Sequence, residues 1–198
     1  RLQGDWSSDV CSSDLIVINA DANGSYNAAK AIEVGRMLQE LNVNFFEEPC
    51  PWEELGETKK VADALTMKVA AGEQDASLWR FQWMMENGVM DIVQPDLNYN
   101  GGFVRALRVA RMAKRFNMPI VPHNTQTGAS AVNIVQFASA MENIGGFMEF
   151  PHRGNEKKES WYTPEFKIRN GAIAVPTAPG LGIQFDPAYL AKAENVTA

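Results

Sequence analysis

Six side chains that could bind a metal ion or transfer a proton recur along the chain at intervals of 23 to 27 residues. Each lies at the end of a short apolar run, such as IVINAD at residues 16–21 or KVAAGE at residues 68–73. This interval is typical of parallel βα units, and it places all six at the carboxyl ends of strands. In a (β/α)-barrel that edge carries the active site. The six residues are Asp21, Glu47, Glu73, Asp96, His123 and Glu149.

The first three of these residues are carboxylates on three successive predicted strands. Asp21, Glu47 and Glu73 would repel one another on a shared edge unless a cation lay between them. Oxygen ligands favour Mg²⁺, or Mn²⁺, whereas zinc prefers histidine and cysteine. Any one of the three could instead cap a helix or pair with an arginine. Their equal spacing favours a metal site.

The next two residues combine a carboxylate with an imidazole. Asp96 and His123 end neighbouring predicted strands, and adjacent strands lie about 4.8 Å apart, so the two side chains can form a hydrogen bond. A carboxylate on one ring nitrogen fixes the tautomer and raises the basicity of the other nitrogen. A single histidine in an apolar run is more often structural, but the partner and the position favour a general base or acid.

Glu149 ends the sixth apolar run, GFMEF at residues 146–150. In apolar surroundings beside a carboxylate substrate, this side chain is expected to stay protonated and to donate a hydrogen bond to an enolate oxygen. The alternative is a buried glutamate bound to the backbone.

These residues require a strand-and-helix repeat to hold them in place. Helices are expected between the strands, the first of them capped by Ser25, over residues 25–41, 53–64, 77–88, 103–116 and 129–141. We therefore predict an α/β fold, a partial (β/α)₈ TIM-type barrel with about six of the eight βα units, over residues 15–150. A closed barrel takes about 250 residues, so the remaining units are expected N-terminal to Leu15. Beyond Pro151 the repeat stops, and residues 151–198 carry two short β-like runs.

Composition excludes several classes of partner. The chain has 198 residues, 45% of them apolar, and a net charge of −6 without a basic run, which argues against nucleic-acid binding. No apolar stretch approaches the roughly 20 residues that span a membrane. Two cysteines, Cys11 and Cys50, favour a reducing compartment, and we predict a cytoplasmic protein.

The first 14 residues do not fit the repeat. They are rich in serine and aspartate, have no usable period, and lack the features of a signal peptide. The stretch WSSDVCSSDL resembles translated sequencing-adapter sequence. We interpret residues 1–14 as a non-native segment.

The ordered motifs resemble one family. The strings DAN, FFEEP, AAGE, QPD followed by GG, PHN and MEF are similar to those of the enolase superfamily, specifically its mandelate racemase-like branch, over about residues 16–191. This resemblance implies a barrel domain like the enolase C-terminal domain, with residues 151–198 returning toward a capping domain. It also implies Asp21, Glu47 and Glu73 as Mg²⁺ ligands, Asp96 and His123 as a catalytic dyad, and Glu149 as the electrophilic residue.

The resemblance further implies a reaction and a substrate class. The shared chemistry is removal of a proton α to a carboxylate, giving an enediolate, and we favour dehydration of an acid sugar to a 2-keto-3-deoxy acid. A mandelate-type racemase or epimerase is the alternative, and a non-catalytic barrel that binds an acidic ligand is a third. The chain is expected to be a fragment, inactive by itself, of a homo-oligomeric enzyme. No nucleic-acid or membrane partner is expected.

Overall fold

The computed structural model describes residues 16–151 and 161–194. Residues 1–14, interpreted above as a non-native segment, lie outside these residues, so that interpretation stays a prediction. The described chain forms two compact units, one made of residues up to 72 together with 79–93, and the other of residues 73–78 together with those from 94 onward. Each unit is described separately below.

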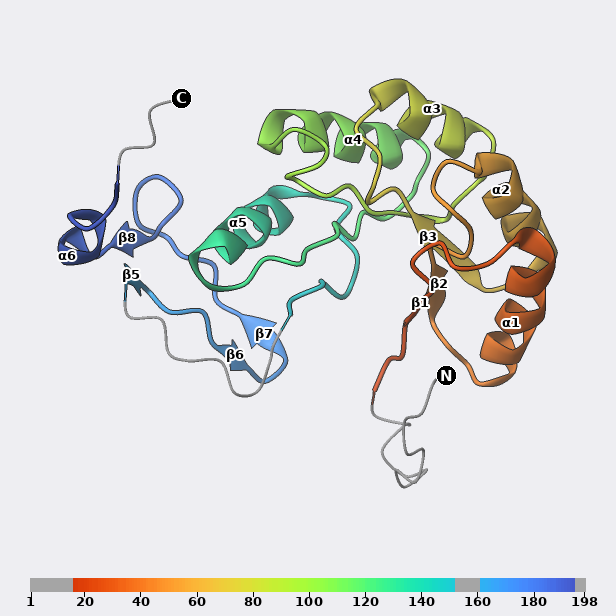
Figure 1. Cartoon of the computed structure of the whole chain (residues 1–198), viewed down its shortest axis with the longest axis horizontal. Helices are drawn as coiled ribbons and strands as arrows, with labels where there is room; N and C mark the ends of the chain where they lie inside the picture. The colour runs from red at the N-terminus through yellow and green to blue at the C-terminus, as the bar shows by residue number, and fades with distance from the viewer. Residues whose placement is uncertain (1–15, 152–160, 195–198) are drawn as a thin grey trace. The chain divides into compact units, whose positions relative to one another are not determined.

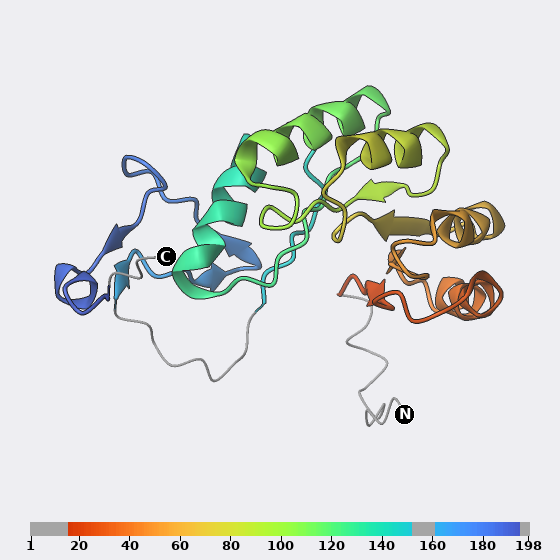
Figure 2. The same cartoon turned by 45° about the horizontal axis from the view of Figure 1, so that its top comes forward.

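The first unit is a parallel sheet with helices between its strands. The sheet order is β1-β2-β3-β4, so strands consecutive in the sequence are neighbours in space. In register, Asp21 lies opposite Glu47, and Glu47 lies opposite Ala70. Figures 1 and 2 show α1 and α2 side by side next to the strands. This is the βα repeat that the sequence predicts, with elements β1 (Ala20–Asp21), α1 (Ala28–Glu40), β2 (Phe45–Glu47), α2 (Leu55–Ala64), β3 (Lys68–Ala71), α3 (Leu78–Glu86) and β4 (Ile92–Val93).

Apolar residues on the inner faces of α1 and α2 pack against β2 and β3 to form the core of this unit. Phe46 is 1% exposed and Val69 is fully buried. Helix α1 approaches α2 closely, since a Cβ atom on Gly35 would lie 2.3 Å from Leu65 Cδ1. The expected cap at Ser25 is wrong by two residues: Asn27 accepts the N–H of Lys30, which satisfies a donor of the first turn.

The second unit contains two longer helices that share a core. Helices α4 (Phe103–Arg115) and α5 (Val132–Ala140), the latter preceded by the 3₁₀ helix η2 (Gly128–Ala131), pack around Ile120. Ala106 is fully buried, and Phe137 is 2% exposed. The sequence predicts both helices, and both lie within two or three residues of their expected bounds.

The fifth and sixth predicted strands are corrected by the structure. Within the described residues 118–151, the backbone forms an isolated parallel bridge between Ile120 and Ile144, and neither segment continues as a strand. Pro122 has no N–H to donate, and Gly145 and Gly146 lower the strand propensity of the partner segment. His123 and Glu149 therefore lie on extended loops rather than on strand ends.

Beyond Pro151 the sequence indicated two short β-like runs, and the described residues 161–194 contain four two-residue strands in two antiparallel pairs. Strand β5 (Tyr162–Thr163) pairs with β8 (Gln184–Phe185), and β6 (Ile168–Arg169) pairs with β7 (Ala172–Ile173). Helix α6 (Pro187–Leu190) follows, with Asp186 as its cap. None of the six predicted site residues lies in this part of the chain.

Candidate active site

Two of the predicted metal ligands are neighbours in the first unit. Asp21 ends β1 and Glu47 ends β2, and the two residues are partners in register. Asp21 is exposed, and its carboxylate accepts the backbone N–H of Asn23 at 2.8 Å and the side-chain amide of Asn23 at 2.5 Å. Parallel pairing thus brings two carboxylates to one end of the sheet, as the spacing predicts.

The third predicted ligand, Glu73, follows β3 by two residues and belongs to the second unit. Among the residues that the structure describes, no group of three histidine, cysteine, aspartate or glutamate side chains is arranged so that it could hold a metal ion. Because Glu73 and the pair of Asp21 and Glu47 belong to different units, the expected trio stays a prediction. The donor set itself, three carboxylates, has the chemistry that a hard divalent cation requires.

Asp96 and His123 form the hydrogen-bonded pair that their positions predict. His123 Nδ1 lies 2.8 Å from Asp96 Oδ2, and both residues are buried. The other carboxylate oxygen of Asp96 accepts the backbone N–H of Asn98 at 2.6 Å and that of Tyr99 at 3.0 Å. Burial by itself would raise the pKa of Asp96, but the hydrogen bonds from His123, Tyr99 and Asn98 outweigh burial and lower it. Asp96 therefore remains a carboxylate that orients the ring.

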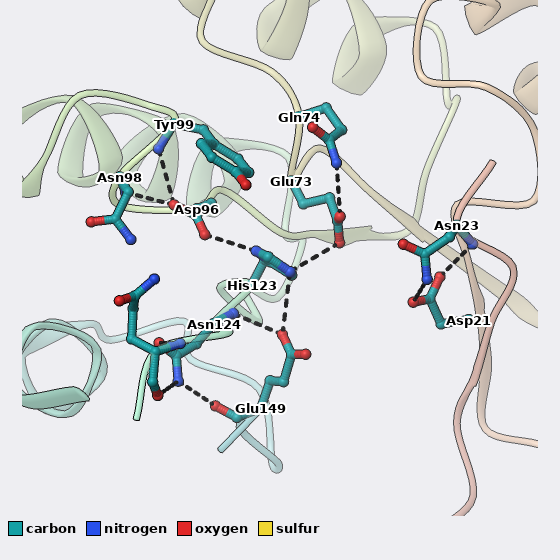
Figure 3. Close-up of polar contacts among 11 residues, drawn as sticks. Asp21, Asn23, Glu73, Gln74, Asp96, Asn98, Tyr99, His123, Asn124 and Glu149 are labelled. Carbon is teal, nitrogen blue, oxygen red and sulfur yellow. Dashed lines mark hydrogen bonds and ion pairs between the residues drawn. The ribbon is translucent and has the colours of Figure 1, made fainter. Parts of the chain in front are cut away.

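The second ring nitrogen of His123 faces two further carboxylates, as Figure 3 shows. Nε2 lies 3.5 Å from Glu73 Oε2 and 4.0 Å from Glu149 Oε2. Burial would lower the pKa of His123, but the hydrogen bond with Asp96 and the charges of Glu73, Glu149 and Asp96 together raise it from 6.5 to about 9. With Nδ1 engaged by Asp96, Nε2 is the nitrogen placed to give or accept a proton.

Glu149 lies next to the imidazole but in different surroundings from those expected. Its side chain is 43% exposed, and its Oε2 accepts the backbone N–H of Asn124 at 2.7 Å. The neighbouring apolar residues in the sequence do not cover it, since Phe147 is itself 58% exposed. The expectation of a buried, desolvated carboxyl is wrong for this structure, because GFMEF runs as a loop and not as a strand between covering elements.

Two residues of this cluster were missed by sequence reasoning. The ring of Tyr99 lies nearly parallel to that of His123, with centroids 6.4 Å apart. Asn124 binds Glu149 through both its backbone and its side chain. Asn124 directly follows His123, and Tyr99 lies in the turn that follows Asp96. This closeness in sequence to predicted site residues is the signal that could have identified them. Glu73 was predicted as a metal ligand, and its contact with His123 was not foreseen.

Cys50 is a buried thiol in the core of the first unit. Burial, and secondarily the charge of Glu57, raises the pKa of Cys50 to about 11. A thiol in this state is a poor nucleophile.

Parallel βα units with an Asp–His pair and carboxylates beyond the strand ends define an α/β protein of the (β/α)-barrel class. The sequence profile of the family described as enolase C-terminal domain-like matches residues 10–189. The chain therefore belongs to the enolase superfamily, in its mandelate racemase-like branch. The resemblance inferred from the motifs is confirmed.

Curated relatives include enzymes that act on sugar acids. The chain is 32% identical over 167 residues to arabinonate dehydratase of Saccharolobus solfataricus, covering 84% of this chain and 44% of the relative. It is 31% identical over 173 residues to D-galactarolactone cycloisomerase of Agrobacterium fabrum, covering 84% of this chain and 46% of the relative. Other matched relatives, at 24% to 31% identity, are named as dehydratases of galactonate, gluconate and xylonate.

Solved structures share the fold. A member of the enolase superfamily from Polaromonas sp. JS666 superposes with a TM-score of 0.81 at 31% identity, covering 92% of this chain and 49% of that one. The chain thus spans about half the length of the proteins it matches. In the part of the chain that the structure describes, no helix is both long and apolar enough to cross a membrane.

Proposed function

We propose that this chain carries the reaction centre of a Mg²⁺-dependent sugar-acid dehydratase, which converts an acid sugar to a 2-keto-3-deoxy acid. The observation that carries the proposal is the buried imidazole of His123, held by Asp96 at 2.8 Å on one nitrogen and facing two carboxylates with the other. A fixed tautomer with one nitrogen directed at a polar cluster is the arrangement that general acid–base catalysis requires.

His123 can serve both proton transfers of a dehydration. As a neutral ring, Nε2 accepts the proton α to the substrate carboxylate. As an imidazolium, Nε2–H donates a proton to the departing β-hydroxyl, which leaves as water. The resulting enol tautomerises to the 2-keto-3-deoxy acid. Asp96 keeps Nδ1 protonated throughout and stabilises the imidazolium form, because its carboxylate accepts that N–H.

Glu149 is proposed to act on the developing enolate. Its Oε2 lies 4.0 Å from His123 Nε2, so a substrate carbon within reach of the imidazole would have its carboxylate oxygens close to this side chain. We propose that Glu149 carries a proton only when a substrate carboxylate is bound beside it, and that it then donates a hydrogen bond to an enolate oxygen. Such a bond stabilises charge where it develops and therefore lowers the barrier.

We further propose Asp21, Glu47 and Glu73 as the residues that hold Mg²⁺, with Mn²⁺ as a substitute. Support comes from their oxygen-only donor set and from the register pairing of Asp21 with Glu47. When bound, the cation would supply Lewis-acid stabilisation of the substrate carboxylate as negative charge develops on it. A test independent of activity is the melting temperature: MgCl₂ should raise it, and Glu47→Gln should abolish this increase. Equal stabilisation of both proteins would contradict the assignment.

An isomerase is the second candidate, because one relative at 31% identity is D-galactarolactone cycloisomerase. Racemisation or epimerisation would use the same removal of the α-proton, followed by reprotonation in place of loss of water. A non-catalytic barrel that binds an acidic ligand is the third candidate. The homo-oligomeric assembly and the cytoplasmic location stay predictions.

The experiment uses the natural protein that contains this chain, with MgCl₂ and a panel of arabinonate, galactonate, gluconate and xylonate in deuterated water. A dehydratase forms a 2-keto-3-deoxy acid, whereas an isomerase incorporates deuterium at the α-carbon without losing water. His123→Asn should abolish both signals, and Glu142→Gln, on a surface pair with Lys114, should retain them. Turnover that persists in His123→Asn would reject the proposed role, and the absence of product and exchange with all four acids would count against the substrate class.

A further inference from the structure

The two loops that carry His123 and Glu149 are joined at both ends by asparagine side chains. At the first end, backbone bonds link Ile120 N–H to Asn143 O and Gly145 N–H to Ile120 O, both at 2.8 Å. The side chain of Asn143 adds bonds to Ala110 O at 3.2 Å and Met118 O at 3.0 Å. Beyond this bridge no strand continues within the described residues 121–151, so other contacts must hold the catalytic ends together.

Asn124 supplies these contacts at the second end. Its side-chain amide donates to Glu149 O at 3.3 Å and to Gln126 O at 3.2 Å, and its Oδ1 accepts the N–H of Gln126 at 3.2 Å. Its backbone N–H donates to Glu149 Oε2 at 2.7 Å. The residue is only 3% exposed, so water does not compete for these bonds. Figure 3 shows Asn124 between the two loops, beside His123 and Glu149.

We propose that Asn124 is a positioning residue that sets the carboxylate of Glu149 against the imidazole of His123. The side chain fixes the main chain of Glu149, and the backbone N–H then fixes its carboxylate. Because Asn124 directly follows His123 in the sequence, one residue constrains both partners of the pair. This inference rests on the proposed function only for its catalytic consequence, since the hydrogen bonds themselves can be tested without activity.

The need for such a residue follows from the exposure of Glu149. Its side chain is 43% exposed, so packing does not select one rotamer for it. Loss of the bond to Glu149 O would let the loop move, and the distance between residue 124 N–H and the carboxylate would then vary. A displacement of about 1 Å in a reacting group can cost as much as 100-fold in rate. The position of the Glu149 carboxylate relative to the buried ring of His123 therefore depends on the bonds of Asn124 more than on packing.

The test compares Asn124→Ala with Asn143→Ala. The control removes an asparagine that also donates to two backbone carbonyls, one in helix α4 and one in the segment that leads to His123, at the end away from the site. In the 198-residue chain, amide hydrogen exchange at residue 124 is measured by NMR and corrected for residue type. We expect Asn124→Ala to speed exchange there by about tenfold, the effect of losing one or two modest hydrogen bonds. Asn143→Ala should change it by less than about twofold.

A second measurement uses the natural protein with its acid substrate. Asn124→Ala should lower kcat by about 10- to 100-fold and change KM by less than about threefold, because positioning and not substrate binding is lost. Asn143→Ala should retain kcat, although its melting temperature should be similar to that of Asn124→Ala. Equal kcat in the two variants, or unchanged exchange at residue 124 in Asn124→Ala, would overturn the proposal. If no acid is turned over, the proposed function fails, and the exchange measurement still decides the role of Asn124.

Discussion

Replacing Asp96 by asparagine should lower the pKa of His123 substantially. The substitution keeps the shape of the side chain and retains an oxygen that can accept the N–H groups of Asn98 and Tyr99. It removes the negative charge that lies 2.8 Å from Nδ1. The neighbouring charges of Glu73 and Glu149, at 3.5 and 4.0 Å from Nε2, remain. The change therefore isolates the contribution of Asp96 to the protonation of the ring.

The magnitude follows from the geometry. An opposite charge in close contact shifts a pKa by roughly one to three units, so the pKa of His123 should fall from about 9 to about 6 to 8. In free energy this corresponds to about 1.4 to 4 kcal/mol between the two protonation states. Burial acts in the same direction once the carboxylate is gone, because His123 is only 8% exposed.

The assay is an NMR titration of the imidazole of His123 in a buffer that contains a metal chelator. The chain has two histidines, so His152→Gln identifies the signal of His123. Glu142→Gln, on the surface pair with Lys114, serves as a charge control and should leave the titration unchanged. An unchanged pKa of His123 in Asp96→Asn would refute the reasoning, since the closest charge in the cluster would then contribute nothing to protonation of the ring.

Three further predictions concern stability. The pKa of His123 is raised from 6.5 to about 9, so the stabilisation of the fold by its protonated ring is complete below pH 6.5 and is lost as the pH rises toward 9. The free energy of unfolding, measured by urea titration, should therefore fall by about 3 kcal/mol over this window. In His123→Gln the fall should be smaller. Asn27→Ala removes the cap that binds Lys30 N–H and should cost about 1 kcal/mol by thermal denaturation, and no loss would contradict capping. Gly35→Ala should destabilise the protein by about 1 to 3 kcal/mol, because the new Cβ would lie 2.3 Å from Leu65 Cδ1. Adding Leu65→Ala to this variant should relieve the clash. A Gly35→Ala protein that is more stable than the parent would show that Leu65 repacks freely.

The sequence predicted the elements of the first unit well, because their signals are local. In this unit, apolar runs of four to six residues alternate with helical periods, and that pattern favours parallel βα units. Strand order and the pairing of Asp21 with Glu47 then follow from the preference of consecutive βα units to lie side by side. The contact between Asp96 and His123 was likewise predictable, because both end segments that neighbour each other in the repeat.

The errors arose where a local pattern depends on a distant partner. The runs ending at His123 and Glu149 read as strands, but a strand exists only when the segment beside it offers a matching row of N–H and C=O groups. Pro122 and the two glycines of the partner segment break that row after the bridge at Ile120. The prediction that Glu149 is buried failed for the same reason. Its apolar neighbours in the sequence suggested a covered side chain, but the structure leaves the side chain 43% exposed.

The sequence by itself thus determined the βα repeat of the first unit, the membership of the enolase superfamily and the identity of the polar residues at the ends of the apolar runs. Those properties depend on composition and spacing along the chain. Only the tertiary structure decided that Glu73 lies beside His123, and that Asn124 links the loops that carry His123 and Glu149. Distances of 3 to 4 Å between residues 25 to 50 positions apart depend on how the segments pack, and the spacing of residues does not encode them.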